Sequence, residues 1–182
     1  MRKVVLAMFM SLDGYINGPG GALRGPAYSA DLQKHWIDRN MERAGTMMYG
    51  RVAYEGMVSY WTSPQAQGPQ ATQLAEMDKL VFSRTLDNAD WGRVTIIRDD
   101  IAGEIAKRRD GDGKDMVLIA GAGIATTFLN LGLVDEFSLL VVPRLLGGGT
   151  RLFKEGLEQT SLKLTEALTF DTGAVRLTYV KG

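Results

Sequence analysis

The segment from Met116 to Thr126 constrains the fold more than any other part of the chain. Its first residues, Met116–Ala120, are apolar and predict a buried strand, while Ile124–Leu131 predicts a helix that begins directly after a glycine turn. Such a junction is typical of α/β proteins. It leaves backbone N–H groups unpaired at the helix start, with the positive end of the helix dipole behind them. Gly121 and Gly123 let phosphates approach the backbone closely. The segment fits a nucleotide-binding turn and an ordinary tight turn equally well.

Strands and helices alternate along the rest of the chain. Apolar runs predict further strands at Val4–Met10, Thr46–Tyr49, Lys79–Ser83, Val94–Ile97 and Glu136–Val142, and helices are expected at Ala30–Arg43, Gly50–Tyr60 and Asp100–Arg109. The stretch Thr62–Ala71, rich in Pro, Gln and Gly, predicts a loop, and alternating apolar residues over 162–170 and 175–179 predict a terminal hairpin. This order predicts one α/β domain over residues 1–182. We expect a three-layer αβα structure with a mixed, mainly parallel sheet and a C-terminal antiparallel hairpin.

The composition excludes several classes of function. The formal net charge is zero, which argues against a general nucleic-acid binder or a basic membrane-surface protein. The chain has no cysteine and its one histidine is His35, so disulfides, thiolate sites and multi-histidine metal sites are excluded, and we expect no metal. No apolar run is long enough to span a bilayer. Arg2-Lys3 and the short apolar run after them resemble the start of a signal peptide, but no cleavage site follows. We therefore expect a buried first strand and a cytoplasmic location.

Basic residues follow two other predicted strands. Arg51 stands at a helix start, where a cation opposes the dipole unless an anion lies nearby, and Ser83-Arg84 ends another strand. Ligands of open α/β sheets bind at the carboxyl ends of strands, and arginine forks suit phosphate oxygens. Together these features favour a phosphorylated dinucleotide. A standard Rossmann fingerprint is disfavoured, because Thr126 replaces the third glycine of G-x-G-x-x-G and the motif lies late in the chain.

Candidates on the substrate side rest on position only. Asp31, in the first turn of a helix, could donate a proton or anchor a heterocycle, but an ordinary acidic residue at a helix start fits the position better. His35 lies one turn later on the same face, and its position favours a role as a partly exposed helix residue over a role as a catalyst. Asp13 is most simply a turn former, and Thr150, after Gly147–Gly149, is unremarkable by itself.

Taken in order, several segments resemble one known family over nearly the whole chain. They are Ser11–Ile16, Tyr49–Glu55, Val81–Leu86, Ile119–Gly123, Gly132–Glu136 and Val142–Phe153. As a set they resemble the dihydrofolate reductase-like superfamily, in the branch of the C-terminal reductase domain of the riboflavin-biosynthesis protein RibD. The resemblance implies the dihydrofolate reductase-like fold and an NADPH-dependent reductase.

The resemblance also implies a cofactor site. Gly50 and Arg51 would meet the cofactor phosphates, and Ser83 and Arg84 would hold the adenosine end and its 2′-phosphate. The turn residues Gly121, Ala122, Gly123, Ile124 and Ala125 would wrap the pyrophosphate, and the backbone near Phe9 and Ile16 would edge the nicotinamide. In dihydrofolate reductases the peptide bond before the matching glycine is cis, which would place a cis bond at Ala120–Gly121.

On the substrate side, Asp31 lies near the carboxylate that dihydrofolate reductases use to hold the pterin, and Thr150 matches the threonine paired with it. The spacing from Asp31 to Gly50 is longer than in those enzymes, and Ala125 stands where they often have an aromatic hydroxyl. The family branch implies the ribosylamino-pyrimidine reduction of riboflavin synthesis. Dihydrofolate reduction, a nucleotide-binding module without catalysis and a bare interaction scaffold stay open. A homodimer is implied by the resemblance, with Glu136–Val142 and the terminal hairpin as candidate contacts.

Overall fold

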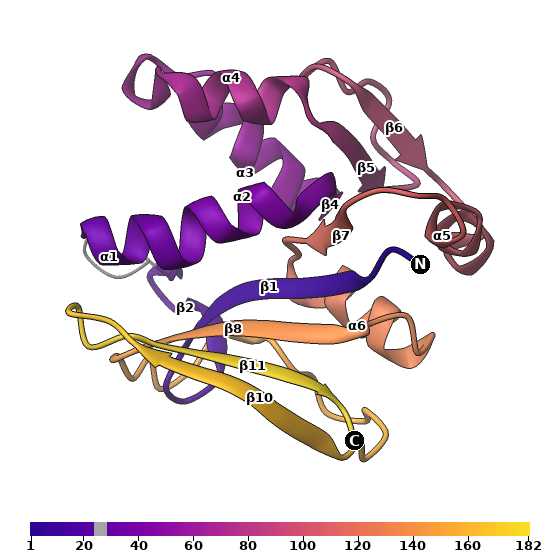
Figure 1. The fold of residues 1–182 in the computed structure, drawn as a ribbon. Helices are drawn as coiled ribbons and strands as arrows, with labels where there is room; N and C mark the ends of the chain where they lie inside the picture. The colour runs from indigo at the N-terminus through magenta and orange to yellow at the C-terminus, as the bar shows by residue number, and fades with distance from the viewer. Residues whose placement is uncertain (24–28) are drawn as a thin grey trace.

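An eight-stranded sheet forms the centre of the protein (Figure 1). The computed structural model describes residues 1–23 and 29–182. The strand order is β10-β11-β8-β1-β7-β4-β5-β6, with neighbours from β8 to β6 parallel and β11 and β10 antiparallel. The strands are β1 (Val4–Ser11), β4 (Ala44–Gly50), β5 (Asp78–Phe82), β6 (Val94–Ile97), β7 (Asp115–Leu118), β8 (Glu136–Val142), β10 (Leu162–Thr169) and β11 (Val175–Lys181). The expected mixed, mainly parallel sheet with a C-terminal antiparallel hairpin is confirmed.

Helices cover both faces of this sheet. Because strand side chains point alternately to the two faces, each face forms its own buried cluster with the helices that cover it. Val4 and Leu6 of β1 belong to one buried cluster, with side chains of α5 (Ile101–Arg109) and α6 (Ala122–Asn130). Val5 and Ala7 belong to the other, with α3 (Arg51–Trp61), α4 (Pro69–Glu76) and the first helical segment. The result is the expected αβα arrangement of three layers. Within the described ranges, none of the helices has the length and apolar character needed to cross a membrane.

The first helical segment departs from the regular helix expected over Ala30–Arg43. It consists of α1 (Ala30–Leu32), a π-helical stretch η1 (Gln33–Asp38) and α2 (Arg39–Arg43). The Ser29 hydroxyl caps it as expected, accepting the Leu32 N–H at 3.1 Å. The His35 carbonyl within the π-helical stretch accepts a hydrogen bond from Arg176 of β11, whose side chain is 2% exposed. The buried Arg176 side chain, from a strand far away in the sequence, thus satisfies a backbone carbonyl of this turn. No local sequence pattern predicts this contact or the π-helical turn.

Several element boundaries also differ from expectation. The stretch Thr62–Ala71, predicted to be a loop, contains the short 3₁₀ helix η2 (Pro64–Ala66) and the start of α4. Proline is tolerated in the first helical turn, and Pro69 begins α4, while burial of Leu74 holds that helix to the sheet. Helix α6 begins at Ala122, two residues before the expected Ile124.

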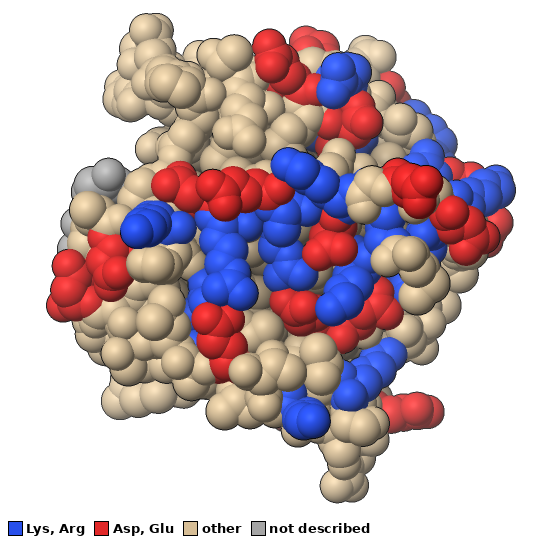
Figure 2. Space-filling model, viewed as in Figure 1, with Lys and Arg blue, Asp and Glu red and all other residues tan. Residues whose placement is uncertain are grey.

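Charges of both signs alternate across the face of the molecule seen in Figure 2. Arg43 pairs with Asp115 at 2.8 Å and with Glu136 at 2.6 Å, and Glu166 pairs with Arg176 at 2.7 Å. The two pairs of Arg43 link helix α2 to strands β7 and β8, and the third pair joins β10 to β11. Opposite charges thus neutralise one another locally, in keeping with the zero net charge of the chain.

A smaller sheet lies beside the main one. It has the order β3-β2-β9, from β2 (Tyr15–Gly18), β3 (Gly21–Ala22) and β9 (Thr150–Arg151). Strand β2 pairs with β9 in antiparallel fashion, with Asn17 opposite Thr150. This small sheet brings the segment after β1 next to the glycine-rich segment before Thr150.

Candidate active site

Three predicted ligand-binding segments leave neighbouring strands at the same edge of the sheet. Strands β7, β4 and β5 are adjacent and parallel, with Met48 opposite Leu118 and Gly50 opposite Phe82. The carboxyl ends of parallel strands meet at one edge, where open α/β sheets bind ligands. The glycine turn after β7, Gly50-Arg51 after β4 and Ser83-Arg84 after β5 therefore gather there, as the strand-end argument expects.

The starts of α3 and α6 lie against each other at this edge. A Cβ atom added to Gly50 would lie 3.1 Å from Cγ2 of Ile124, so glycine permits the close approach. Both helices begin at a glycine N-cap in extended conformation, and neither cap has a side-chain hydrogen bond. Their first backbone N–H groups therefore remain available to an anion, with two helix dipoles behind them.

The five predicted turn residues divide into two groups. A Cβ added to Gly121 or Gly123 would meet no atom within 4 Å, so open space adjoins both glycines. Ala122 and Ala125 are buried in the core, and Ile124 packs against it. The glycines thus face the space where a ligand can lie, while the other three residues fix the helix to the sheet.

The cis peptide bond expected between Ala120 and Gly121 is not found, and that prediction is wrong. The bond is trans. Gly121 is extended, with φ −72° and ψ 162°, and leads directly into α6, so the chain needs no reversal at this point. A trans bond between residues other than proline is favoured by about 3 kcal/mol.

Both candidate phosphate-binding arginines have carboxylate partners. Arg51 pairs with Glu55, one helical turn later, at 3.0 Å, and Arg84 Nε lies 3.3 Å from Asp99 Oδ1. The side chains of Arg51 and Glu55 are nearly half exposed and those of Arg84 and Asp99 more than three-quarters exposed, so each guanidinium can exchange its partner for an anion at a modest cost in free energy. Glu55 thus supplies a local reason why Arg51 is tolerated at a helix start.

Sequence reasoning missed Arg98, which follows β6 directly. Its guanidinium donates to the carbonyls of Arg84 (3.2 Å) and Leu86 (3.0 Å) and so holds the turn after β5. Ser83 Oγ accepts the N–H groups of Thr85 and Leu86 within the same turn. The strand-end rule, applied to one more predicted strand, would have pointed to Arg98.

Asp13 does more than form a turn. Its carboxylate accepts hydrogen bonds from Ser11 Oγ (2.6 Å) and from the N–H groups of Leu146 (3.1 Å) and Gly147 (2.8 Å). The hydrogen bond from Ser11 is the main cause that lowers the Asp13 pKa to about 2, and the two backbone donors add to it. Asp13 thereby ties the turn after β1 to the segment that carries Gly147–Gly149 and Thr150.

The remaining predicted site residues fall near this junction but do not all meet. Phe9 lies near the carboxyl end of β1 with 39% of its surface exposed, whereas Ile16 of β2 is buried in the core. Oδ1 of Asp31 lies 3.7 Å from Nε2 of His35, and both side chains are about two-fifths exposed. Within residues 1–23 and 29–182, no described hydrogen bond or ion pair joins Asp31 to Thr150. The pairing of these two candidates therefore stays a prediction.

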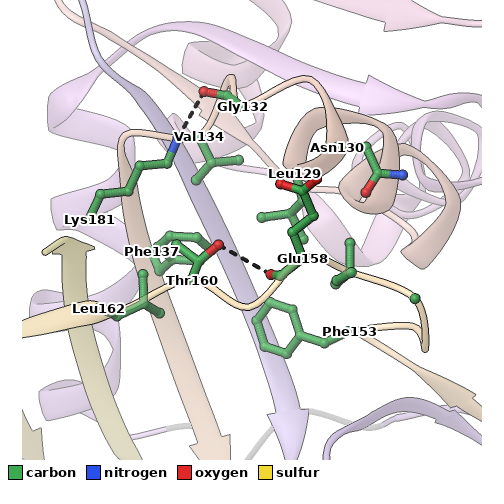
Figure 3. A pocket seen from close by; sticks show the side chains of 12 residues that line it. Leu129, Asn130, Gly132, Val134, Phe137, Phe153, Glu158, Thr160, Leu162 and Lys181 are labelled. Atoms are coloured by element: carbon green, nitrogen blue, oxygen red, sulfur yellow. Dashed lines mark hydrogen bonds between the residues drawn. The ribbon is translucent and has the colours of Figure 1, made fainter.

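A cavity of about 700 Å³ lies at the opposite end of the sheet (Figure 3). Val134 and Phe137, at the amino end of β8, line it together with Leu129 at the end of α6, and Lys181 donates to the Gly132 carbonyl across its rim. The nine residues of α6 separate this cavity from the glycine turn by roughly 13 Å. No group of three His, Asp or Glu side chains suited to a metal occurs in the part of the chain that the structure describes. Because the predicted ligand-binding segments follow the carboxyl ends of β7, β4 and β5, that edge of the sheet remains the candidate site.

Comparison with known proteins agrees with this architecture. The family model of the RibD C-terminal domain matches residues 2–176. The uncharacterized protein YyaP of Bacillus subtilis (strain 168) is 32% identical over 183 residues, covering 98% of this chain and 94% of that protein.

Solved structures show the same fold. A putative riboflavin biosynthesis protein from Shewanella sp. PV-4 superposes with a TM-score of 0.77 at 23% identity, over 100% of this chain and 99% of that one. A dihydrofolate reductase from Enterococcus faecalis, complexed with NADP(H) and RAB-propyl, gives a TM-score of 0.65 at 14% identity, over 99% and 96% of the two chains. This chain belongs to the RibD C-terminal domain family and has the dihydrofolate reductase-like fold.

Proposed function

We propose that this protein is an NADPH-dependent reductase that transfers a hydride to a small heterocyclic substrate. The substrate class that the family favours is that of 5-amino-6-(5-phosphoribosylamino)uracil, reduced in riboflavin biosynthesis. The observation that carries the proposal is the convergence of an open glycine turn and two arginine-bearing strand ends at one sheet edge. The dihydrofolate reductase with the same fold was solved with NADP(H), which supports this choice of cofactor.

The residues at this edge suit a phosphorylated dinucleotide. The free N–H groups at the starts of α3 and α6 would bind the pyrophosphate together with Arg51, and the gap beside Gly121 and Gly123 leaves room for it. Ser83 and Arg84 would hold the 2′-phosphate. The backbone near Phe9 and Ile16 would lie along the edge of the nicotinamide ring, which supplies the hydride when bound.

Asp31 is our candidate for assisting protonation of the substrate, directly or through a water molecule, and Thr150, which matches the threonine paired with that carboxylate in dihydrofolate reductases, is the second substrate-side candidate. Asp31 is partly exposed and pairs only loosely with His35, so its carboxylate can reach a ligand. The other contributions of the protein are positioning of the substrate against the cofactor and exclusion of water.

Two measurements test the proposal. NADPH oxidation is followed over a panel of aminopyrimidine, pterin and carbonyl substrates, and dinucleotide binding is measured separately by calorimetry. Oxidation with an aminopyrimidine supports the proposal, and oxidation with dihydrofolate alone would instead make the protein a dihydrofolate reductase. Tight NADPH binding without any turnover would indicate a nucleotide-binding module, and absence of binding would refute the cofactor site altogether.

Arg84→Ala tests the assignment of the 2′-phosphate. Loss of one charge-assisted contact should weaken NADPH binding at least tenfold and NADH binding much less. Arg93→Ala is a matched control, because Arg93 is also an exposed arginine paired with a carboxylate (Asp78, 2.7 Å) but precedes β6, at the opposite edge of the sheet. Equal losses for NADPH and NADH would show that Arg84 does not bind the 2′-phosphate.

A further inference from the structure

We propose that Asp99 sets how strongly this site prefers a 2′-phosphorylated dinucleotide, by competing with the 2′-phosphate for Arg84. The inference rests on the proposed function and concerns a residue to which neither the sequence motifs nor the family resemblance gives a role. It makes Asp99 a specificity-determining residue of the cofactor site.

The sheet brings the two residues together. Strands β5 and β6 are parallel neighbours, with Phe82 opposite Ile97, so the segments that follow them leave the same edge side by side. Arg84 Nε lies 3.3 Å from Asp99 Oδ1. Both side chains are more than three-quarters exposed, so either can rotate to a ligand without leaving a buried charge behind.

The backbone around this ion pair is held by other contacts. The Ser83 N–H donates to the Ile97 carbonyl at 3.0 Å, and Arg98 holds the carbonyls of Arg84 and Leu86. Ser83 Oγ accepts two backbone N–H groups, so the hydrogen of its own hydroxyl remains to be donated to an anion. The turn is therefore fixed, and the ends of Arg84 and Asp99 are the parts that can exchange partners.

This arrangement affects the two classes of dinucleotide in opposite ways. A 2′-phosphate must displace Asp99 from Arg84 and then lie near its negative charge, which weakens binding of the phosphorylated cofactor. A ribose 2′-hydroxyl carries no charge, and a carboxylate can accept its hydrogen, as acidic residues do in NAD sites. Asp99 thus narrows the difference in affinity between NADPH and NADH.

The test compares Asp99→Asn with the parent chain, using calorimetry at low salt with NADP⁺ and NAD⁺. We expect the dissociation constant for NADP⁺ to fall about two- to fivefold, the range of an exposed ion pair, while that for NAD⁺ stays the same or rises. Asp78→Asn is the matched control, because Asp78 also pairs with an exposed arginine but lies at the amino end of β5. Equal tightening of both ligands, or the same selectivity change in Asp78→Asn, would overturn the proposal.

A double-mutant cycle separates competition for Arg84 from a general charge effect. In the Arg84→Ala background, Asp99→Asn should shift the ratio of NADP⁺ to NAD⁺ affinities by less than in the parent chain, because the contested guanidinium is gone and only the direct effect of the Asp99 charge on the ligand remains. A selectivity shift of the same size with and without Arg84 would refute competition for Arg84. A parent chain that binds both dinucleotides, with Asp99→Asn having no effect on their ratio, would reject only the role of Asp99. A parent chain that binds neither would reject the proposed function and this inference with it.

Discussion

Gly149→Ala should be the most damaging of three neighbouring glycine substitutions, because only Gly149 is enclosed by backbone. Its φ is +117°, a conformation that side-chain-bearing residues rarely adopt. A Cβ atom there would lie 2.0 Å from the Asn17 carbonyl oxygen and 2.8 Å from the Cα atom of Gly18. Both atoms belong to β2, so no side-chain rotation can relieve the overlap, and β2 must separate from β9 by about 1 Å.

The cost follows from these contacts. A strained φ contributes about 1–3 kcal/mol, and each weakened hydrogen bond between β2 and β9 contributes about 1 kcal/mol. A total near 3 kcal/mol lowers the melting temperature of a domain of this size by about 6–12 °C. Since β9 carries Thr150, the same change should also weaken binding of ligands that contact this part of the site.

The two preceding glycines serve as graded controls, measured by thermal unfolding of the same preparations. Gly148→Ala has ordinary φ and no atom closer than 3.9 Å (Pro19 Cγ), so it should change stability by less than about 0.5 kcal/mol. Gly147 has a φ of +69°, and a Cβ atom there would meet open space. Gly147→Ala should therefore lower the free energy of unfolding by about 1 kcal/mol, the cost of the left-handed backbone conformation alone. A melting temperature for Gly149→Ala within 2 °C of that for Gly148→Ala would refute the packing of β2 against this segment.

Two further predictions concern stability and association. Burial, with the nearby charge of Arg93 as a smaller cause, lowers the Lys79 pKa to about 8 from its ordinary 10.5. The unfolded chain therefore holds more protons between pH 8 and 10.5, and the free energy of unfolding should rise with pH in that window, by up to about 1.4 kcal/mol per pH unit. Urea unfolding of Lys79→Met should lack this rise, and an unchanged pH dependence would contradict the burial of a charged lysine. The homodimer implied by the resemblance should form through β10 rather than β8. Strand β8 is enclosed between β1 and β11, whereas β10 is a sheet edge with Leu162 and Leu164 40% and 49% exposed. Leu164→Glu should convert the dimer to a monomer in light scattering, and an unaffected dimer would place the contact elsewhere.

Much of the fold follows from local pattern. The strands Val94–Ile97 and Glu136–Val142 have the predicted bounds, and the terminal hairpin forms where alternating residues predict it. Asp100 caps α5, accepting the Gly103 N–H at 3.0 Å. These features depend on hydrophobic periodicity, capping and turn chemistry within a few residues, which the sequence displays directly.

The site was predictable only to the level of its segments. That Gly121, Arg51 and Ser83 end or follow strands is visible in the sequence, and the strand-end rule then places them on one edge. The partners of these residues are not visible. The strand-end rule reaches Arg98 itself, but not its contacts with the turn after β5, nor the pairing of Asp99 with Arg84, because these contacts cross between segments that the sheet alone aligns.

The sequence by itself determined the alternation of strands and helices, the glycine turn and the family, because each depends on residues close together in the chain or on motifs in a fixed order. The tertiary structure alone decided which strand ends are neighbours, through a sheet order that does not follow the chain order. It also decided that Asp13 would bind Gly147, 134 residues away, and that Arg176 would satisfy the turn at His35, 141 residues away. Such contacts depend on how the whole chain buries its apolar surface, so their partners are fixed only when the sheet has assembled.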